Sequence, residues 1–232
     1  MAYYIFVENE KINGAGQARI LNEETINFEV DESLYNAFVE SPDMYIWDGN
    51  EVVVDQDYEA KQAQKERKRI ALLNMTGADV ERAIYKVKGI DFDDILAMVK
   101  DNPAIDEKAL KIEFKANNFF RGNPYIEKVG SLLGFTEGML NKFFETKDYH
   151  YLTKKTLTIN ATPSNAIITI DGEVTNKVEV PYGTDVEYSV ELEGYTSYYG
   201  SINLIEDKAI DVELKEVKNE ETNTTIDDSA NE

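Results

Sequence analysis

Few residues of this chain have the types and spacing that chemistry requires. His150 is the single histidine and there is no cysteine, so neither a nucleophilic triad nor a zinc site can be completed. The chain has 45 aspartates and glutamates, and among so many acids a catalytic pair cannot be told from chance. We therefore expect no catalytic residue, no metal ligand and no cofactor. An acidic hydrolase has only the abundance of carboxylates in its favour.

Three short segments resemble binding motifs only superficially. The acidic run 91–94 lies at the start of a predicted helix, where carboxylates favour the helix dipole. The acids of segment 55–59 lack the glycine and the terminal glutamate of a calcium loop. Gly14-Ala15-Gly16 precedes a predicted strand rather than a helix, so we interpret it as a turn and not as a phosphate loop.

Two groups of side chains remain as candidates for recognition. The first is a basic group in a predicted helix over residues 57–74, and it can be a solvated helix face or a contact with an acidic neighbouring subunit. The second is a tyrosine group in the C-terminal part, where rings with polar tips suit sugar stacking or protein contact but also occur at core positions. The basic group consists of Lys61, Lys65, Arg67, Lys68 and Arg69, and the tyrosine group of Tyr182, Tyr198 and Tyr199.

The elements that carry these groups follow from the hydrophobic pattern. Residues 1–55 are interpreted as β structure, with a hairpin at Asp48-Gly49-Asn50 and Trp47 as the anchor of a small sheet. Residues 56–74 form one long charged helix whose apolar positions are too sparse to bury it. Residues 157–214 hold short alternating strands with turns at Asp171-Gly172 and Tyr182-Gly183, which is typical of a small β-sandwich.

Residues 75–149 are predicted to be a compact helical unit. Helix starts are indicated by Thr76, by Asn123 before Pro124, and by Thr136. A short helix is predicted over 92–99, and a longer periodic stretch over 105–120. The acidic segment 216–232 has too few large apolar residues to offset its ordering entropy, so we predict a disordered tail.

Charge and hydropathy exclude several classes of partner. The net charge of −21 has the wrong sign for attraction to nucleic acid or to an anionic membrane surface. Nowhere do about 20 apolar residues run together, so we expect no membrane insertion. The first residues lack the basic and apolar regions of a secretory signal, so the protein is expected to be made in the cytoplasm and kept inside the cell until lysis or assembly.

The helical unit carries Met75-Thr76, Asn123-Pro124, Leu133-Gly134-Phe135-Thr136 and a final Leu140-Asn141-Lys142-Phe143-Phe144. In these motifs it resembles a unit of accessory proteins from the tail and baseplate genes of phages that infect Gram-positive bacteria. The resemblance covers roughly residues 45–147. Gly77-Ala78-Asp79 departs from the basic-acidic pair that usually follows Met-Thr, which leaves open a relative with a different role.

The C-terminal β region is similar to PEGA and bacterial immunoglobulin-like (Ig-like) modules, which implies a sandwich with Pro163 breaking an edge and a role in display or adhesion. The expected fold class is α+β multidomain. Its predicted parts are N-terminal β hairpins (1–55), a long charged helix (56–74), a helical bundle unit (75–149), an Ig-like or PEGA-like sandwich (155–215) and a disordered acidic tail (216–232).

Together the resemblances imply a virion structural protein of a tailed phage or phage-tail-like particle, associated with the tail or baseplate, attached by its N-terminal part and displaying the Ig-like domain. The expected partners are other virion and tail proteins, in several copies, with a host cell-surface glycan as a further candidate. The alternative is a bacterial cell-surface or adhesin-type module that binds glycan or protein. The absence of a signal segment speaks against that alternative.

Overall fold

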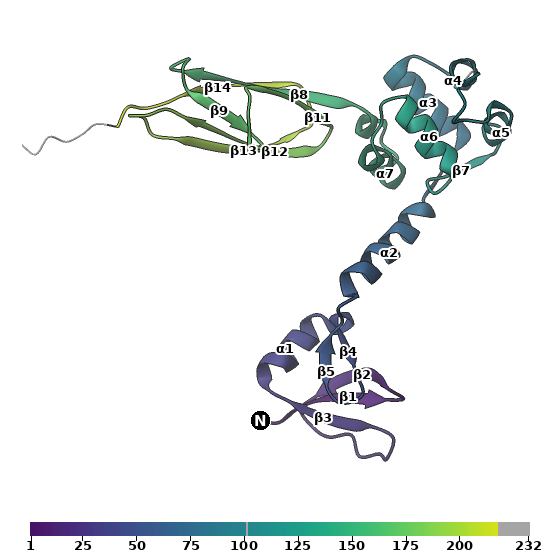
Figure 1. The fold of residues 1–232 in the computed structure, drawn as a ribbon, viewed down its shortest axis with the longest axis vertical. Coiled ribbons are helices and arrows are strands. Elements are labelled where there is room, and N and C mark those ends of the chain that lie inside the picture. Colours follow the sequence, from purple (N-terminus) through teal and green to yellow (C-terminus); the bar gives the residue numbers. More distant parts are fainter. Residues whose placement is uncertain (101, 218–232) are drawn as a thin grey trace, which may run out of the picture. The chain divides into compact units, whose positions relative to one another are not determined.

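The computed structural model describes residues 1–100 and 102–217, and the chain divides into two compact units, Met1–Ile70 and Ala71–Glu232 (Figure 1). Helices and several sheets are present, which confirms the α+β multidomain class. The predicted tail begins too early, because Glu216 pairs with Tyr195 in an antiparallel bridge and the Val217 N–H donates to the Gly194 carbonyl. The rest of that segment, 218–232, lies outside the described residues.

The first unit is built on a three-stranded antiparallel sheet with strand order β2-β1-β3. Ile5, Phe38 and Val52 form its buried core, and Trp47 packs edge-on against Phe28 with ring centroids 5.2 Å apart. Its elements are β1 (Tyr3–Glu8), β2 (Lys11–Gly16), β3 (Ile26–Val30), α1 (Glu32–Glu40), the short 3₁₀ helix η1 (Pro42–Met44), β4 (Tyr45–Trp47) and β5 (Val52–Val54).

Two expectations for this region are wrong. The interpretation of residues 1–55 as β structure alone misses α1, which begins after Asp31, whose side chain accepts the Leu34 N–H at 2.8 Å. The Gly14-Ala15-Gly16 segment is part of strand β2, and the turn before it lies at Asn9 and Glu10. A β-carbon at Gly16 would lie 3.0 Å from Cζ of Phe6, so the missing side chain makes room for that ring.

The long charged helix is α2 (Tyr58–Ala71), and no residue in it is buried, as the sparse apolar pattern predicted. It ends earlier than expected because the next segment pairs as a strand. β6 (Asn74–Thr76) and β7 (Asn118–Phe120) form an antiparallel ribbon, which the Arg121 N–H extends by donating to the Leu73 carbonyl at 2.8 Å. The predicted boundary at residue 74 is therefore corrected to Ala71.

Helices of the second unit enclose one apolar core that includes Ile95, Leu110 and Phe143. The predicted starts are confirmed, because the side chains of Thr76, Asn123 and Thr136 accept backbone N–H groups at the first turns of α3, α6 and α7. The helices are α3 (Gly77–Lys88), α4 (Phe92–Val99), α5 (Glu107–Glu113), α6 (Pro124–Leu132) and α7 (Glu137–Thr146).

The predicted helical stretch over 105–120 is only half helical. α5 ends at Glu113, and the chain then extends into β7. The aromatic residues explain this change, because Phe114 stacks on Phe92 with centroids 4.0 Å apart while Phe119 contacts the same ring from β7. An unbroken helix would lose the ribbon with β6.

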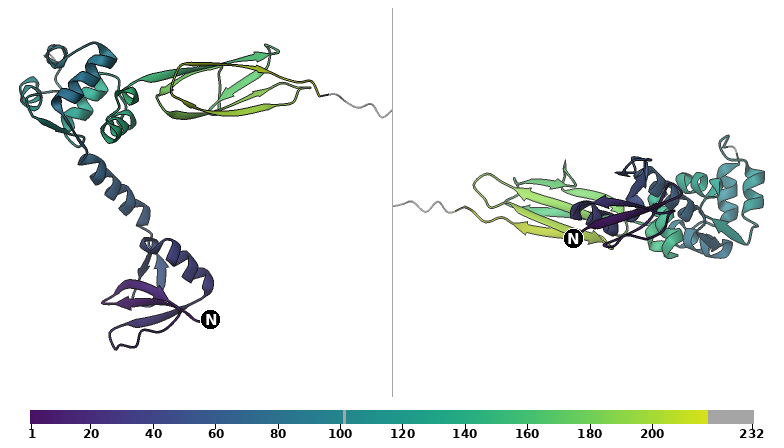
Figure 2. Two further views of the ribbon diagram at one scale, coloured as in Figure 1. Left: turned by 180° about the vertical axis from the view of Figure 1, so that it is seen from behind. Right: turned by 90° about the horizontal axis from the view of Figure 1, so that it is seen from below.

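Beyond the 3₁₀ helix η2 (Tyr149–Leu152), the second unit continues as a two-layered β structure (Figure 2). A four-stranded sheet has the order β10-β9-β12-β13, and a three-stranded sheet has the order β11-β8-β14. Leu157, Ile159, Val186 and Val190 are fully buried between the two sheets. The strands are β8 (Lys154–Thr162), β9 (Ile167–Ile170), β10 (Glu173–Val174), β11 (Lys177–Pro181), β12 (Thr184–Glu191), β13 (Tyr198–Leu204) and β14 (Lys208–Glu213).

The turns of the sandwich lie where the sequence predicts them. Asp171 and Gly172 both have positive φ between β9 and β10, and Gly183 has φ +78° between β11 and β12. The expectation for Pro163 is wrong, because this residue follows β8, the middle strand of its sheet, and so does not break an edge.

Candidate functional site

The basic group lies on α2, but its members differ in position and in partners. Lys61, Lys65 and Lys68 recur at helical spacing and share one face, whereas Arg67 projects from another. Arg69 bonds Glu66 through two nitrogens, each at 2.7 Å. Lys65, Arg67 and Lys68 are exposed, and none of them forms a salt bridge with another residue in the described part of the chain.

Lys61 has a structural partner at the start of α2. Its Nζ lies 2.7 Å from Oδ2 of Asp55, whose other carboxylate oxygen accepts the Asp57 N–H. The hydrogen bond from Lys61 lowers the pKa of Asp55, which is buried, and the same contact raises the pKa of Lys61. Lys61 therefore anchors the helix, and the part of the basic group open to a partner reduces to Lys65, Arg67 and Lys68.

The carboxylates of the acidic segments accept hydrogen bonds from backbone N–H groups. Asp91 and Asp94 form a capping box at α4, in which each side chain accepts the N–H of the other residue. His150 places Nδ1 2.6 Å from Asp148, and its backbone N–H lowers the pKa of that carboxylate by hydrogen bonding. Among residues 1–100 and 102–217, no three histidines or carboxylates are grouped so that they could hold a metal ion.

The structure does not bring the three candidate tyrosines together. Tyr182 lies at the β11–β12 turn, where it meets the edge of the Tyr151 ring at 5.2 Å and its N–H donates to the Thr153 carbonyl at 3.0 Å. Thr153 directly follows Leu152, which is buried in the helical core, so Tyr182 lies where the helices join the sandwich. It is therefore a structural contact in this protein.

Tyr198 and Tyr199 lie at the other end of the sandwich, at the beginning of β13. The antiparallel register pairs Tyr198 with Val190 and Tyr199 with Ser189, whereas the end of β13 pairs Leu204 with Thr184 beside the Tyr182 turn. Tyr199 is 70% exposed, and its hydroxyl donates to Glu191 at 2.9 Å. Both residues are exposed, but as neighbours in one strand they lie on opposite faces of the sheet, with Tyr199 on the outer face.

A shallow hollow opens on the outer face of the four-stranded sheet beside Tyr199. Thr169, Ser189, Ser201 and Glu187 are among the residues that line it. The sequence pattern does not identify these residues, because their shared face depends on the pairing of β12 with both β9 and β13. Hydroxyls, a carboxylate and an exposed aromatic ring are groups that can bind a polar, ring-shaped ligand.

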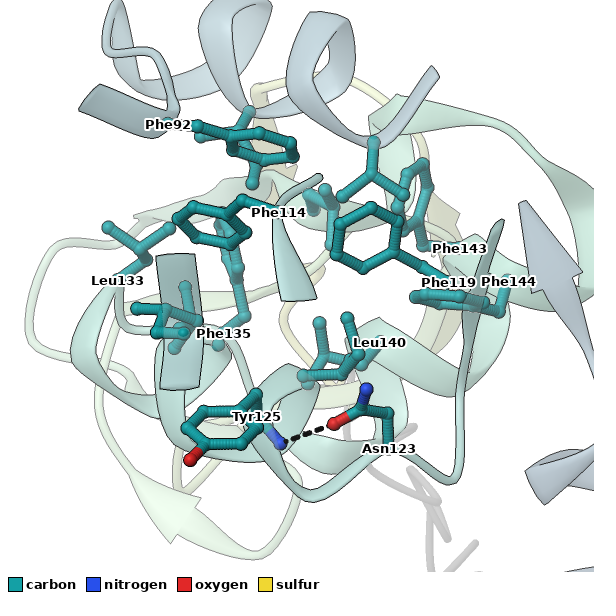
Figure 3. A pocket seen from close by; sticks show the side chains of 17 residues that line it. Phe92, Phe114, Phe119, Asn123, Tyr125, Leu133, Phe135, Leu140, Phe143 and Phe144 are labelled. Carbon is teal, nitrogen blue, oxygen red and sulfur yellow. Dashed lines mark hydrogen bonds between the residues drawn. The ribbon is translucent and has the colours of Figure 1, made fainter. Parts of the chain in front are cut away.

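The core of the helices contains a small apolar cavity of about 30 Å³, shown in Figure 3. Phe114, Phe135 and Leu140 are among its lining side chains. Asn123 reaches it, but its Oδ1 accepts the Tyr125 N–H and its Nδ2 donates to Glu113. With the amide already bonded, the cavity offers a ligand no polar partner, and we interpret it as a packing defect.

Comparison with known families finds a match in the C-terminal β region. Residues 154–216 match the family described as "Head fiber dimeric protein-like domain", and the matched segment coincides with strands β8 to β14. No curated protein matches the chain. The family match indicates a structural protein of a phage virion that associates with other virion proteins. Within the described residues, no helix is both long enough and apolar enough to span a bilayer.

Proposed function

We propose that this protein is a fiber-type component on the outside of a phage particle, with the β-sandwich as the displayed domain. The observation that carries the proposal is the family match over 154–216, which covers a complete two-sheet domain with its own buried core. The words "head fiber" in the family's description favour the head surface as its position. A tail or baseplate position is the second candidate, and the motifs of the helical region favour it.

Residues 1–150 are proposed to attach to the particle, and residues 155–215 to project from it. Support comes from α2, which buries none of its residues and carries the exposed cations Lys65, Arg67 and Lys68. An isolated helix of 14 residues is marginal in water, so contact with a neighbouring protein would stabilise it. In a chain with a net charge of −21, an exposed basic segment suits an acidic partner surface.

We further propose that the chain acts by assembly rather than by catalysis, and that it acts in pairs. The family's description as dimeric supports a second copy of the same chain as a partner. The hollow beside Tyr199 supports binding of a host cell-surface glycan as a second candidate function, which is also the activity of the adhesin-type alternative.

The test is the position of the protein in purified particles. An antibody raised against residues 154–217, followed by gold labelling in the electron microscope, is expected to decorate the head. Labelling of the tail or baseplate would select the second position. If mass spectrometry of purified particles does not detect the chain, the proposal of a virion component is wrong.

A further inference from the structure

We propose that two copies of this chain pair through strand β13, so that their four-stranded sheets join into one continuous sheet across a two-fold axis. The inference rests on the proposed function, since the second copy as partner comes from the family's description as dimeric. It goes further by naming the surface and the register of the contact.

The sandwich has two sheets and therefore four edge strands, and three of them carry features that oppose pairing with another chain. β10 has only two residues. β11 contains Lys177, Glu179 and Pro181, and β14 contains Lys208, Asp211 and Glu213. Short length, charge and proline are the devices by which natural edge strands avoid association.

β13 has none of these devices. It is the outer strand of the four-stranded sheet, it has seven residues, and its sequence Tyr-Tyr-Gly-Ser-Ile-Asn-Leu contains no charge and no proline. Apolar surface is exposed along it, with Tyr198 44%, Tyr199 70% and the following Ile205 55% exposed. An uncharged strand of this length with exposed aromatic residues is a template for β-augmentation.

The backbone hydrogen bonds show which groups of β13 face outward. The Glu187 N–H donates to the Asp171 side chain and the Glu187 carbonyl accepts the Asp171 N–H, both at 2.9 Å, so the backbone of Glu187 points away from β13. Its register partner Ser201 is therefore in a non-hydrogen-bonded pair and turns its N–H and carbonyl to the free edge. By alternation along the strand, Tyr199 and Asn203 do the same.

This pattern is self-complementary. Ser201 is the central residue of β13, so antiparallel pairing of two copies about it places Ser201 opposite its own equivalent and Tyr199 opposite Asn203 of the second copy. All three outward-facing residues then exchange backbone hydrogen bonds with the second copy. The two sheets twist into one without any change inside either sandwich.

The position on the two-fold axis allows a charge-swap experiment on the full chain. Ser201→Lys places two lysines opposite each other in the dimer, and Ser201→Glu places two glutamates there. Each variant alone is expected to weaken the dimer by at least about tenfold in Kd, measured by analytical ultracentrifugation. An equimolar mixture is expected to recover a dimer of one Lys chain and one Glu chain, which a merely misfolded variant could not do.

Two further variants test the backbone contact. Ser201→Pro removes the outward N–H and leaves the hydrogen bonds to β12 in place, so it is expected to give a monomer with an unchanged far-UV circular dichroism spectrum. Ser201→Thr keeps that N–H and is the matched control, expected to remain a dimer. If the wild-type chain is a monomer at all concentrations, the proposed pairing itself is wrong. If the wild type is a dimer and the Pro and charged variants dimerise equally well, a dimer exists but β13 is not its interface.

Discussion

The ring of Tyr188 lies against the backbone of Gly200, its register partner across the β12–β13 pair. A β-carbon at position 200 would lie 2.4 Å from Cζ of Tyr188. Tyr188 is buried, which raises the pKa of its hydroxyl, and neighbouring Tyr198 raises that pKa further while its ring stacks at 6.1 Å. The strand that carries the exposed tyrosines is therefore held to the sheet by an aromatic ring that fits only over glycine.

Gly200→Ala is expected to destabilise the sandwich by about 1–3 kcal/mol, because the Tyr188 ring must leave its place over the strand. Hydrogen exchange of β12 and β13 peptides in the full chain measures the loss. Gly138→Ala is the control, since a β-carbon there meets only Thr136 Oγ1 at 3.9 Å and alanine suits a helix. Equal exchange in Gly200→Ala and wild type would contradict the close contact.

The same reasoning applies where α6 crosses α7. A β-carbon at Gly130 would lie 2.6 Å from Cδ1 of Leu140. Gly130→Ala is expected to cost about 1–3 kcal/mol in the wild type and much less in a Leu140→Ala background, where the clashing atoms are absent. A double-mutant cycle from urea unfolding, followed by the helical circular dichroism signal, gives the coupling. Additive effects of the two substitutions would show that these residues do not touch.

Asp55→Asn is expected to lower the stability of the first unit near neutral pH. Lys61 lowers the pKa of Asp55, so the stabilisation is present above the unfolded-state pKa of about 3.9 and disappears as the pH falls through the lower folded-state value. Trp47, the single tryptophan, reports this unit by fluorescence during denaturation. Variant and wild type are expected to differ at about pH 7 and to converge only once the pH has fallen below the lowered folded-state pKa of Asp55. Asp43→Asn, an exposed position in η1, is the control. A difference that persists unchanged in acid would exclude the ion pair as its cause.

Reversal of Lys65, Arg67 and Lys68 to glutamate is expected to reduce incorporation into particles. The loss is expected to be larger at low salt, where the Debye length is about 30 Å at 0.01 M. Quantitative blotting of purified particles measures incorporation. The control makes the same change in net charge on the sandwich, at Lys177, Lys208 and Lys215. A similar loss in both variants would mean that total charge matters and the α2 surface does not.

Local features of this fold could be predicted from the sequence, and features that depend on distant pairing could not. The caps at Thr76, Asn123 and Thr136 involve residues two or three positions apart, so the pattern alone identifies them. The β6–β7 ribbon joins segments 74–76 and 118–120, and its hydrogen bonds leave no periodic signal in either segment. For that reason the helices predicted from the sequence run past the observed ends of α2 and α5, at Ala71 and Glu113.

The candidate site shows the same division. Composition marked Tyr198 and Tyr199, but the strand order that makes β13 an edge separates them from Tyr182. Likewise, the charge pattern predicts Lys61 as an assembly contact, and only the structure reveals that Lys61 forms a salt bridge with Asp55. The sequence does carry one signal of such a pairing, since a glycine inside a strand pattern, such as Gly200, indicates close approach of another group.

The central claim is that the N-terminal part attaches the protein to the particle and the sandwich projects from it. Particles that lack the intact chain can be supplied with fragment 1–153, which keeps Leu152 in the helical core, or with fragment 154–232, after circular dichroism has shown that each is folded. The measurement is the amount of each fragment that remains with purified particles. We expect fragment 1–153 to be retained at near wild-type level and fragment 154–232 to be lost in washing. Retention of fragment 154–232 alone would contradict the account and make the sandwich the anchor.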